Sequence, residues 1–254
     1  MKLRICLGLF ALLLWASAAQ AGLVIHQETM GGPSTMYAQD NQVRAGMGRG
    51  GMIYDLNHDT VTMLNPDRQV YWSGNPNTLK QQMNQAMDSR IEAALKQVPP
   101  DQREQMRAMM KQRMGMTKTP PQPPDKVEVK KTGESAKIAG YQSQKYQVYV
   151  DGKLRQEVWM ASAPGFKGQV DLTKMTKLAQ AMNPQSAAPG SSWRNSPEMT
   201  KLMSAGMPMK MVEYSRGGPM TVMTVTSVEQ KKLPASTFQP PAGWKQVDFN
   251  QMMQ

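Results

Sequence analysis

Residues 52–72 read MIYDLNHDTVTMLNPDRQVYW, and this stretch decides the fold class. Apolar and polar residues alternate over positions 52–56, which is the period of a strand with one buried face. Turn-forming residues follow at positions 57–59 and again at 65–67, and they separate further strand candidates at 60–64 and 69–72. Three short strands joined by tight turns predict an antiparallel meander.

Further strand candidates lie on both sides of this meander. The chain before it carries two short apolar–polar stretches separated by Gly31-Gly32-Pro33. Asp151-Gly152 is a strong two-residue hairpin signal, and Gly217-Gly218 indicates another turn. The strands expected outside the meander are 23–30, 36–45, 126–131, 136–139, one through 146–150, 154–161, 209–214 and 220–228.

A helical pattern replaces the strand pattern over residues 75–116. Asn75 or Asn77 can cap a helix, and the apolar residues that follow recur at spacings of three or four. These residues are Leu79, Met83, Met87, Ile91, Leu95 and Val98. Pro99-Pro100 ends this helix, and Asp101 can begin a second one. The pair predicts a helical hairpin inserted between strands.

The second helix of this hairpin carries a methionine stripe with a basic surround. The stripe consists of Met106, Met109, Met110 and Met114, and the basic residues are Arg103, Arg107, Lys111 and Arg113. Such a stripe is typical of a helix that packs onto a core, with its basic residues in water. It also fits a helix that binds a membrane surface or a partner protein, and the sequence leaves both interpretations open.

Together these patterns predict an α+β fold. We expect a curved antiparallel sheet, an open half-barrel, whose concave face is covered by the helices of residues 75–116 and by a helix over 171–182. Residues 22–249 are expected to form one domain, with a proline-rich linker at 117–125 and a tail at 250–254.

The first 21 residues have the features of a secretory signal peptide. Lys2 and Arg4 precede an apolar run over residues 7–16, and Ala19-Gln20-Ala21 supplies small residues where a signal peptidase cleaves. The run is too short to span a hydrocarbon core of about 30 Å. We therefore expect cleavage after Ala21, release into the periplasm and no transmembrane span in the mature chain.

Removal of this segment changes the chemistry that the chain can offer. Cys6 is the only cysteine, so the mature chain has no thiol for a disulfide, a nucleophile or a metal site. The loss of Lys2 and Arg4 lowers the formal net charge from +11 to +9. A basic exported protein is better suited to anionic lipid or envelope polymers than to nucleic acid, and the charge is equally consistent with a role in solubility alone. The 24 methionines that remain after Met1 is removed suit adaptable apolar surfaces.

Two motif-like stretches lack the context that their chemistry needs. Residues 46–51 contain G-x-G-x-x-G, but a strand pattern follows where a dinucleotide site needs a helix. Asp55-x-Asn57-x-Asp59 resembles the start of a calcium loop. Thr60 and Pro66 then stand where that loop needs Gly and Glu. We interpret both stretches as connections between strands.

Catalysis is not expected from this sequence. His26 and His58 are the only histidines, they lie in different strand segments, and no nucleophile motif accompanies them. We therefore predict a protein that is not an enzyme and that carries no cofactor.

A second methionine group admits three interpretations. Its members are Met199, Met203, Met207, Met209 and Met211. Pairs of them share a helix face or a strand face, which favours a role in the core. They also fit an adaptable ligand-binding surface, and soft thioethers are ligands that select Cu(I).

Three stretches of the chain support a family resemblance. They are residues 51–55 with Tyr71-Trp72, residues 138–141 with Lys145-Tyr146 and residues 157–159, and Phe238 with Pro241-x-Gly243-Trp244. The chain resembles an uncharacterised family of exported bacterial proteins with a domain of unknown function. That domain is similar to the open half-barrel of lipoprotein carriers of the LolA/LolB type. The resemblance implies a half-barrel fold and assigns no functional residue.

These observations favour a non-catalytic periplasmic binding, carrier or chaperone-like protein. Its expected ligand is an acyl chain or an apolar protein segment, held by Met83, Met87, Met106, Met109, Met110 and Met114. The alternatives are Cu(I) binding or oxidant scavenging by the second methionine group, and a basic scaffold that binds anionic envelope lipid.

Overall fold

The structure, a computed structural model, describes residues 21–47, 50–113, 125–162, 164–182, 192–215 and 217–252. Residues 1–20 of the expected signal peptide, nearly all of the expected linker and Met114 lie outside the described residues.

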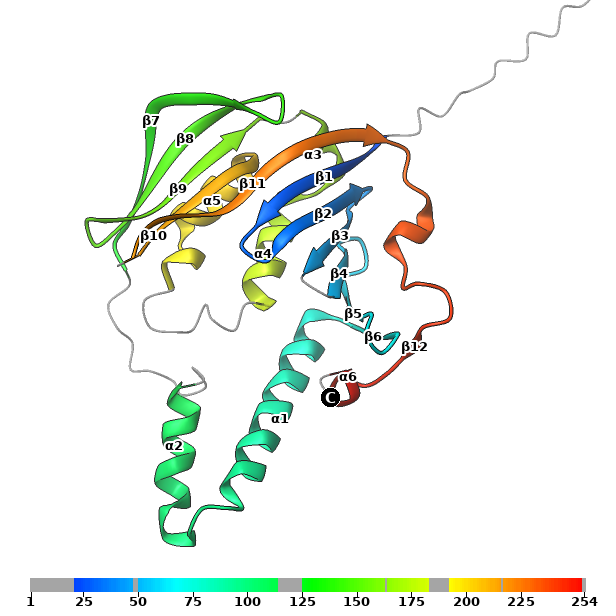
Figure 1. Ribbon diagram of the computed structural model, residues 1–254, viewed down its shortest axis with the longest axis vertical. Helices are drawn as coiled ribbons and strands as arrows, with labels where there is room; N and C mark the ends of the chain where they lie inside the picture. The colour runs from blue at the N-terminus through cyan, green and yellow to red at the C-terminus, as the bar shows by residue number, and fades with distance from the viewer. Residues whose placement is uncertain are drawn as a thin grey trace, which may run out of the picture.

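The strands of the described residues form one large, curved, open sheet (Figure 1). Its spatial order is β12-β6-β5-β4-β3-β2-β1-β11-β10-β9-β8-β7, and neighbours are antiparallel except for the parallel pair β12 and β6. The strands are β1 (Gly22–Thr29), β2 (Gly32–Gln39), β3 (Gln42–Met47), β4 (Gly50–Asp55), β5 (Thr60–Asn65), β6 (Val70–Gly74), β7 (Val127–Ile138), β8 (Tyr141–Val150), β9 (Lys153–Ala161), β10 (Met207–Ser215), β11 (Gly218–Lys231) and β12 (Lys245–Gln246).

Strand β1 lies in the middle of the sheet and joins two meanders. It pairs with β2 on one side and with β11, from the other end of the chain, on the other. Leu23 and Ile25 point into the main core, whereas Val24 points into a smaller core on the opposite face. All three side chains are at most 2% exposed, because both faces of the sheet are covered here.

Two of the expected strand boundaries are wrong. The stretch 36–45 is two strands, because Asp40 and Asn41 form a turn with φ of 50° and 62° between β2 and β3. Asp and Asn tolerate this left-handed conformation better than most residues, so a polar pair inside the stretch marks a turn. The stretches 126–131 and 136–139 are one strand, β7, with a register shift between Lys131 and Ser135.

The other strand expectations agree with the structure. The meander of residues 52–72 forms β4, β5 and β6. Asp151 and Gly152 have φ of 50° and 74°, as the tight turn between β8 and β9 requires. Of the expected connection over residues 46–51, residues 46–47 belong to β3 and 50–51 to β4, and 48–49 lie outside the described residues. Asp55 Oδ1 accepts hydrogen bonds from the backbone N–H groups of Asn57 and His58 in the next turn. The α+β class is confirmed, and most of the structure is sheet.

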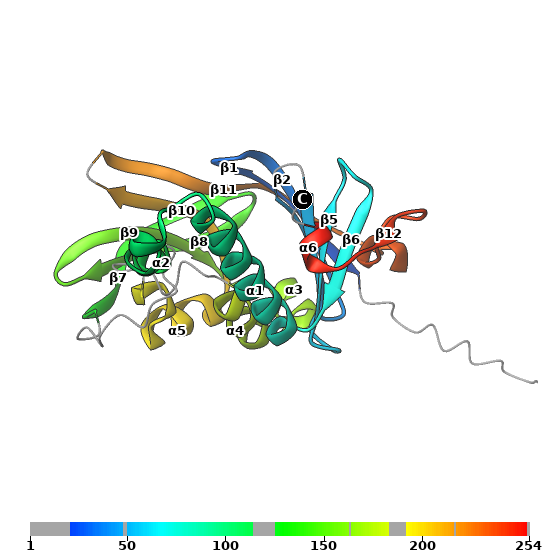
Figure 2. The same cartoon turned by 90° about the horizontal axis from the view of Figure 1, so that it is seen from below.

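Several helices lie on one face of the sheet, as the view from below shows (Figure 2). Leu79 of α1, Leu178 of α4 and Phe249 of α6 enter the main core, and Trp193 and Met199 pack into a second core over β8 and β9. The helices are α1 (Pro76–Leu95), α2 (Arg103–Arg113), α3 (Pro164–Gln169), α4 (Leu172–Met182), α5 (Pro197–Ala205) and α6 (Phe249–Met252), with 3-10 turns at Pro100–Gln102, Ser192–Asn195 and Ala235–Phe238.

The expected covering of the concave face by residues 75–116 holds only in part. Leu79, Met83 and Ala86, from the first half of α1, pack against the sheet. The second half of α1 and α2 extend away from it as a projecting hairpin (Figure 1). Ile91 and Leu95 are buried in α1 but belong to none of the sheet-based cores. The amphipathic stripe of α2 therefore faces α1.

None of the helices in the described part of the chain combines the length and the apolar character that crossing a membrane requires.

The start of α1 provides a test of the local structure. Asn75 is the N-cap, and its side chain accepts a hydrogen bond of 2.8 Å from the backbone N–H of Thr78. We expect Asn75→Ala to lower the free energy of unfolding by about 1 kcal/mol, measured by urea denaturation. Asn77→Ala is the control, because Asn77 is exposed and caps nothing, and its effect should stay within about 0.5 kcal/mol. Equal losses from the two variants would contradict this assignment of the cap.

Candidate functional site

A half-exposed apolar row crosses the concave face of β2, β3, β4 and β5. Met36 pairs with Ala45, Ala45 with Met52, and Met52 with Met63, so the four residues lie side by side across four strands. We call these four residues the methionine row. Each is only partly buried, although the row continues into the fully buried Ile25 at one end and Trp72 at the other.

The first half of α1 packs on the same core as two members of this row. Met83 and Ala86 are partly buried against the same core as Met36 and Met63. Helix α1 also contacts α4 and α6, which pack on the sheet at either side. Because these contacts use unbranched methionines and a small alanine, the surface between α1 and the row can repack around an inserted apolar group.

The structure does not bring the described methionines of residues 83–114, which were expected to bind the apolar ligand, together at one site. Met83 faces the sheet. On the projecting hairpin, Met87, Met106 and Met110 are half-buried, and Met109 is 41% exposed. The structure therefore brings only Met83 of the described members of this set to the methionine row.

Two basic residues of α2 are paired with acidic residues of α1. Arg107 makes a two-pronged contact with Glu92, with Nε–Oε1 and Nη2–Oε2 distances of 2.8 and 3.0 Å. Lys111 lies 3.0 Å from Asp88. These ion pairs raise the pKa of Arg107 and lower that of Glu92 through the shared hydrogen bonds. Much of the basic surround of the stripe thus joins the two helices together.

The second methionine set lies in the interior. Met199 and Met203 pack in the core over β8 and β9, whereas Met207 and Met209 belong to the main core. Met211 contacts both cores. Met199, Met207 and Met209 are at most 3% exposed, as expected of core residues. In the described ranges, no group of three or more His, Cys, Asp or Glu side chains is placed to hold a metal ion.

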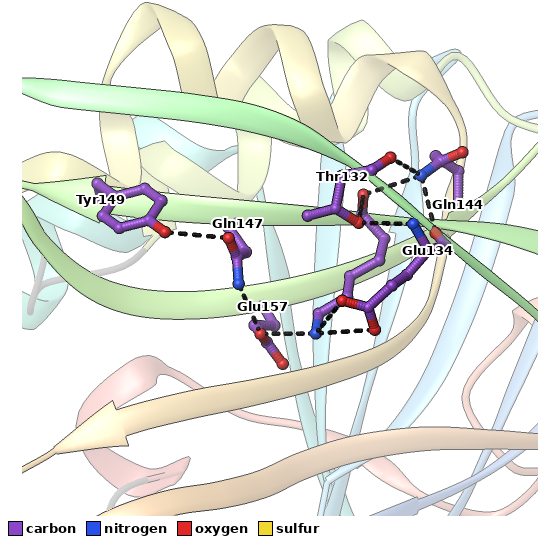
Figure 3. Close-up of polar contacts among 7 residues, drawn as sticks. Thr132, Glu134, Gln144, Gln147, Tyr149 and Glu157 are labelled. Atoms are coloured by element: carbon purple, nitrogen blue, oxygen red, sulfur yellow. Dashed lines mark hydrogen bonds and ion pairs between the residues drawn. The ribbon is translucent and has the colours of Figure 1, made fainter.

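A polar network covers the opposite face of β7, β8 and β9 (Figure 3). Its centre is the ion pair between Lys145 and Glu157, with an Nζ–Oε1 distance of 2.8 Å and both side chains at most 12% exposed. Lys145 also contacts both carboxylate oxygens of Glu134 at 3.3 Å. Gln147 donates to Glu157 at 3.0 Å and accepts from the hydroxyl of Tyr149 at 3.0 Å.

The same network holds the irregular part of β7. Gln144 donates to the backbone oxygens of Thr132 and Glu134, at 2.7 and 2.8 Å, where the register of β7 shifts. Thr132 donates through Oγ1 to the backbone oxygen of Lys145. These bonds satisfy backbone groups that the strand ladder leaves free at the shift, which gives the network a structural role.

The pKa values of the central pair reflect this arrangement. Burial acts to raise the pKa of Glu157, but the hydrogen bonds from Lys145, Gln147 and Tyr214 outweigh it and lower the pKa. The hydrogen bond to Glu157 raises the pKa of Lys145, and burial opposes it. Both residues therefore stay charged near neutral pH, and neither is poised to transfer a proton there.

Removing one partner of this pair tests its contribution to stability. We expect Glu157→Gln to lower the free energy of unfolding at pH 7 by about 1–3 kcal/mol, because Lys145 loses its buried partner. Since folding lowers the pKa of Glu157, its stabilisation is complete above the ordinary value of 4.5 and disappears as pH falls through the lowered pKa. Denaturation of both proteins across pH 3–7 measures the difference. Exposed Glu28→Gln is the control, and a difference independent of pH would contradict the assignment.

Comparisons with known proteins give one family and no functional relative. No curated protein matches the chain. One solved structure, described as "Structure of PNGF-II in C2 space group", aligns with 13% identity and a TM-score of 0.37, over 92% of this chain and 32% of that one. The chain thus spans about a third of that protein, and the likeness is too low to support an argument.

A family model described as "Domain of unknown function (DUF4412)" matches residues 73–244. The match runs from the end of β6, through the helices and the second meander, to Trp244 beside the smaller core. It includes all described members of both methionine sets and the whole polar network. Since it covers more than half of the chain, the protein belongs to the DUF4412 family.

Proposed function

We propose that the protein is a non-catalytic carrier, exported to the periplasm, that binds an apolar ligand on its methionine row. The ligand is an acyl chain or an apolar segment of another protein. The observation that carries this proposal is the row itself: four apolar side chains in cross-strand register, each left only partly buried on the face of the sheet that carries α1.

The side chains of the row and its cover suit a ligand that varies in shape. Met36, Met52 and Met63 are flexible and polarizable, and Met36 and Met63 pack against the same core as Met83 of α1. Contiguous apolar surface that a folded protein leaves partly open commonly marks a binding surface. A methionine-lined surface accepts several ligands because its side chains repack at little cost.

The energies of uncovering and binding favour a long apolar ligand. Moving the first half of α1 away from the sheet exposes Leu79, Met83 and Ala86, which costs about 4–7 kcal/mol if their burial is lost. Each buried methylene of an acyl chain contributes about 0.8 kcal/mol. A chain that buries more than about nine methylenes (from about 0.8 kcal/mol each) therefore offsets the displacement of α1.

One feature of the sequence and one feature of the fold support the same function. The first 21 residues have the features of a cleaved signal peptide, which supports export to the compartment where acyl chains must cross water. The open curved sheet with helices over one face is the arrangement expected of a LolA-type half-barrel. In such a carrier the helices act as a movable cover, and here α1 has that position (Figure 2).

Substitution in the row tests the proposed site. We expect the double variant Met36→Gln/Met63→Gln to bind the apolar dye N-phenyl-1-naphthylamine at least ten-fold more weakly than the unsubstituted protein, because two polar amides replace apolar contacts. The dissociation constant is measured by fluorescence titration.

The matched control is Met30→Gln/Met220→Gln, which makes the same chemical change at methionines that are 65% and 45% exposed. Circular dichroism checks that both variants fold. Equal dye affinities in the two folded variants, or no saturable dye binding by the unsubstituted protein, would refute the proposed site. Lipid extracted from protein purified after export, and identified by mass spectrometry, reports the natural ligand.

A further inference from the structure

A groove lies over the first meander of the sheet, beside the C-terminal segment. Its lining comes from β1 to β5, from the 3-10 turn at Ala235–Phe238 and from the loop before β12. Its volume is about 1060 Å³. Sites for small molecules commonly have volumes of about 300–1,000 Å³, so this groove has room for a ligand of more than one ring.

The floor of the groove is main chain. Gly46 and Gly51 are cross-strand partners on β3 and β4, and both line the groove. A Cβ at Gly51 would lie 3.1 Å from the backbone oxygen of Ala45, so the main chain of this member of the methionine row forms part of the floor. Ser34 Oγ donates to the backbone oxygen of Gly46 at 3.0 Å, which holds β2 against β3. A ligand therefore lies over these strands and not between them.

Aromatic side chains stand at two sides of this floor. Tyr37 is on β2, and Trp244 immediately precedes Lys245, through which β12 pairs with β6. Both aromatic residues line the groove, and both are partly exposed while they pack against the smaller core. The three strand spacings from β2 to β5 amount to about 14 Å. The two aromatic residues are therefore far enough apart to contact different parts of one ligand.

Polar groups that lack a partner also line the groove. Among the described residues of the lining, Arg44 alone carries a formal charge, and it pairs directly with Tyr37 across β2 and β3. Its Nη1 donates to the backbone oxygen of Thr237 at 3.1 Å, which orients the guanidinium. Within the described part of the chain, Arg44 forms no ion pair with a carboxylate, and the hydroxyls of Tyr37 and Thr237 form no hydrogen bond. These groups are free to bind a ligand.

We propose that this groove binds an acidic saccharide, with a carboxylate at Arg44 and a sugar ring against Trp244. The C–H groups on one face of a sugar ring pack on aromatic rings, and its hydroxyls bond to polar side chains and to main chain. A lining with one cation and no carboxylate complements a uronate group, and the remaining N–H groups of the guanidinium can bind both of its oxygens.

The same features argue against an acyl chain in this groove. Glycines offer little apolar surface to a methylene chain, whereas the methionine row offers much. The formal net charge of +11 favours an anionic ligand, and the expected export favours one from the envelope. The inference goes beyond the proposed carrier function and does not rest on it.

The test titrates the full chain with trigalacturonate in a calorimeter. We expect saturable binding with a dissociation constant below about 1 mM. The fully methyl-esterified trisaccharide keeps the rings and hydroxyls but carries no charge. It should bind at least about ten-fold more weakly, because it cannot form charge-assisted hydrogen bonds with Arg44.

Gly46→Val tests the location. A Cβ at Gly46 meets Ser34 Oγ at 3.7 Å and Thr35 O at 3.8 Å, which are ordinary contact distances, so the side chain occupies the floor of the groove without displacing either residue. We expect at least about a ten-fold loss of affinity for trigalacturonate. Gly133→Val is the matched control, because a Cβ there meets nothing within 4 Å and the position lies on β7, outside the groove. Circular dichroism checks that both variants fold.

Arg44→Gln tests the charge, with exposed Arg155→Gln on β9 as its control. We expect only Arg44→Gln to remove the preference for the acid over its ester, a ratio that a general loss of structure would not change selectively. The proposal is overturned if trigalacturonate shows no saturable binding up to about 1 mM, if the ester binds equally well, if Gly46→Val binds like Gly133→Val, or if Arg44→Gln keeps the preference. The dye assay of the methionine row enters none of these outcomes, so either proposal can fail alone.

Discussion

The pairing of β1 with both β2 and β11 is the constraint on which the rest of the structure depends. One strand near the start of the chain, β1 (Gly22–Thr29), joins a meander that follows it to a meander that ends with β11 at Lys231. Leu23 and Ile25 anchor it to the helices, and Val24 anchors it to Leu233 and Phe238 on the other face. Because the register of β1 with β2 sets Met36 beside Ile25, the same pairing positions the methionine row.

Local sequence patterns predicted much of the local structure. They did not predict contacts between distant parts of the chain. The turn at Asp151-Gly152 and the cap at Asn75 could be predicted because each depends on the backbone preference of one or two residues. The division of residues 36–45 was missed because Asp40 and Asn41 also fit the polar positions of a continuous strand. The position of α2 was missed for a different reason. An amphipathic stripe shows that one face is buried, but it does not identify the partner that buries it.

Local sequence patterns could not predict the candidate site either. Met36, Ala45, Met52 and Met63 are separated by nine, seven and eleven positions, and no period in the sequence relates them. They meet because three successive turns set the register of four strands, and an error of one residue in any turn would move a side chain to the other face. The methionines of α2 were conspicuous because helical spacing places them three or four positions apart. In the structure they help to hold a helical hairpin together, whereas the scattered methionines form the open row.

The place of β1 in the sheet also orders events during synthesis. Strand β1 is made early, but its partner β11 is complete only when residue 231 has been added. Until then the first meander has an open edge at β1, and the second has not been joined to it. Contacts between residues this far apart in the chain slow folding, because the intervening segment must be closed into a loop first. In a chain with this topology the two halves of the sheet join only when the chain is almost complete.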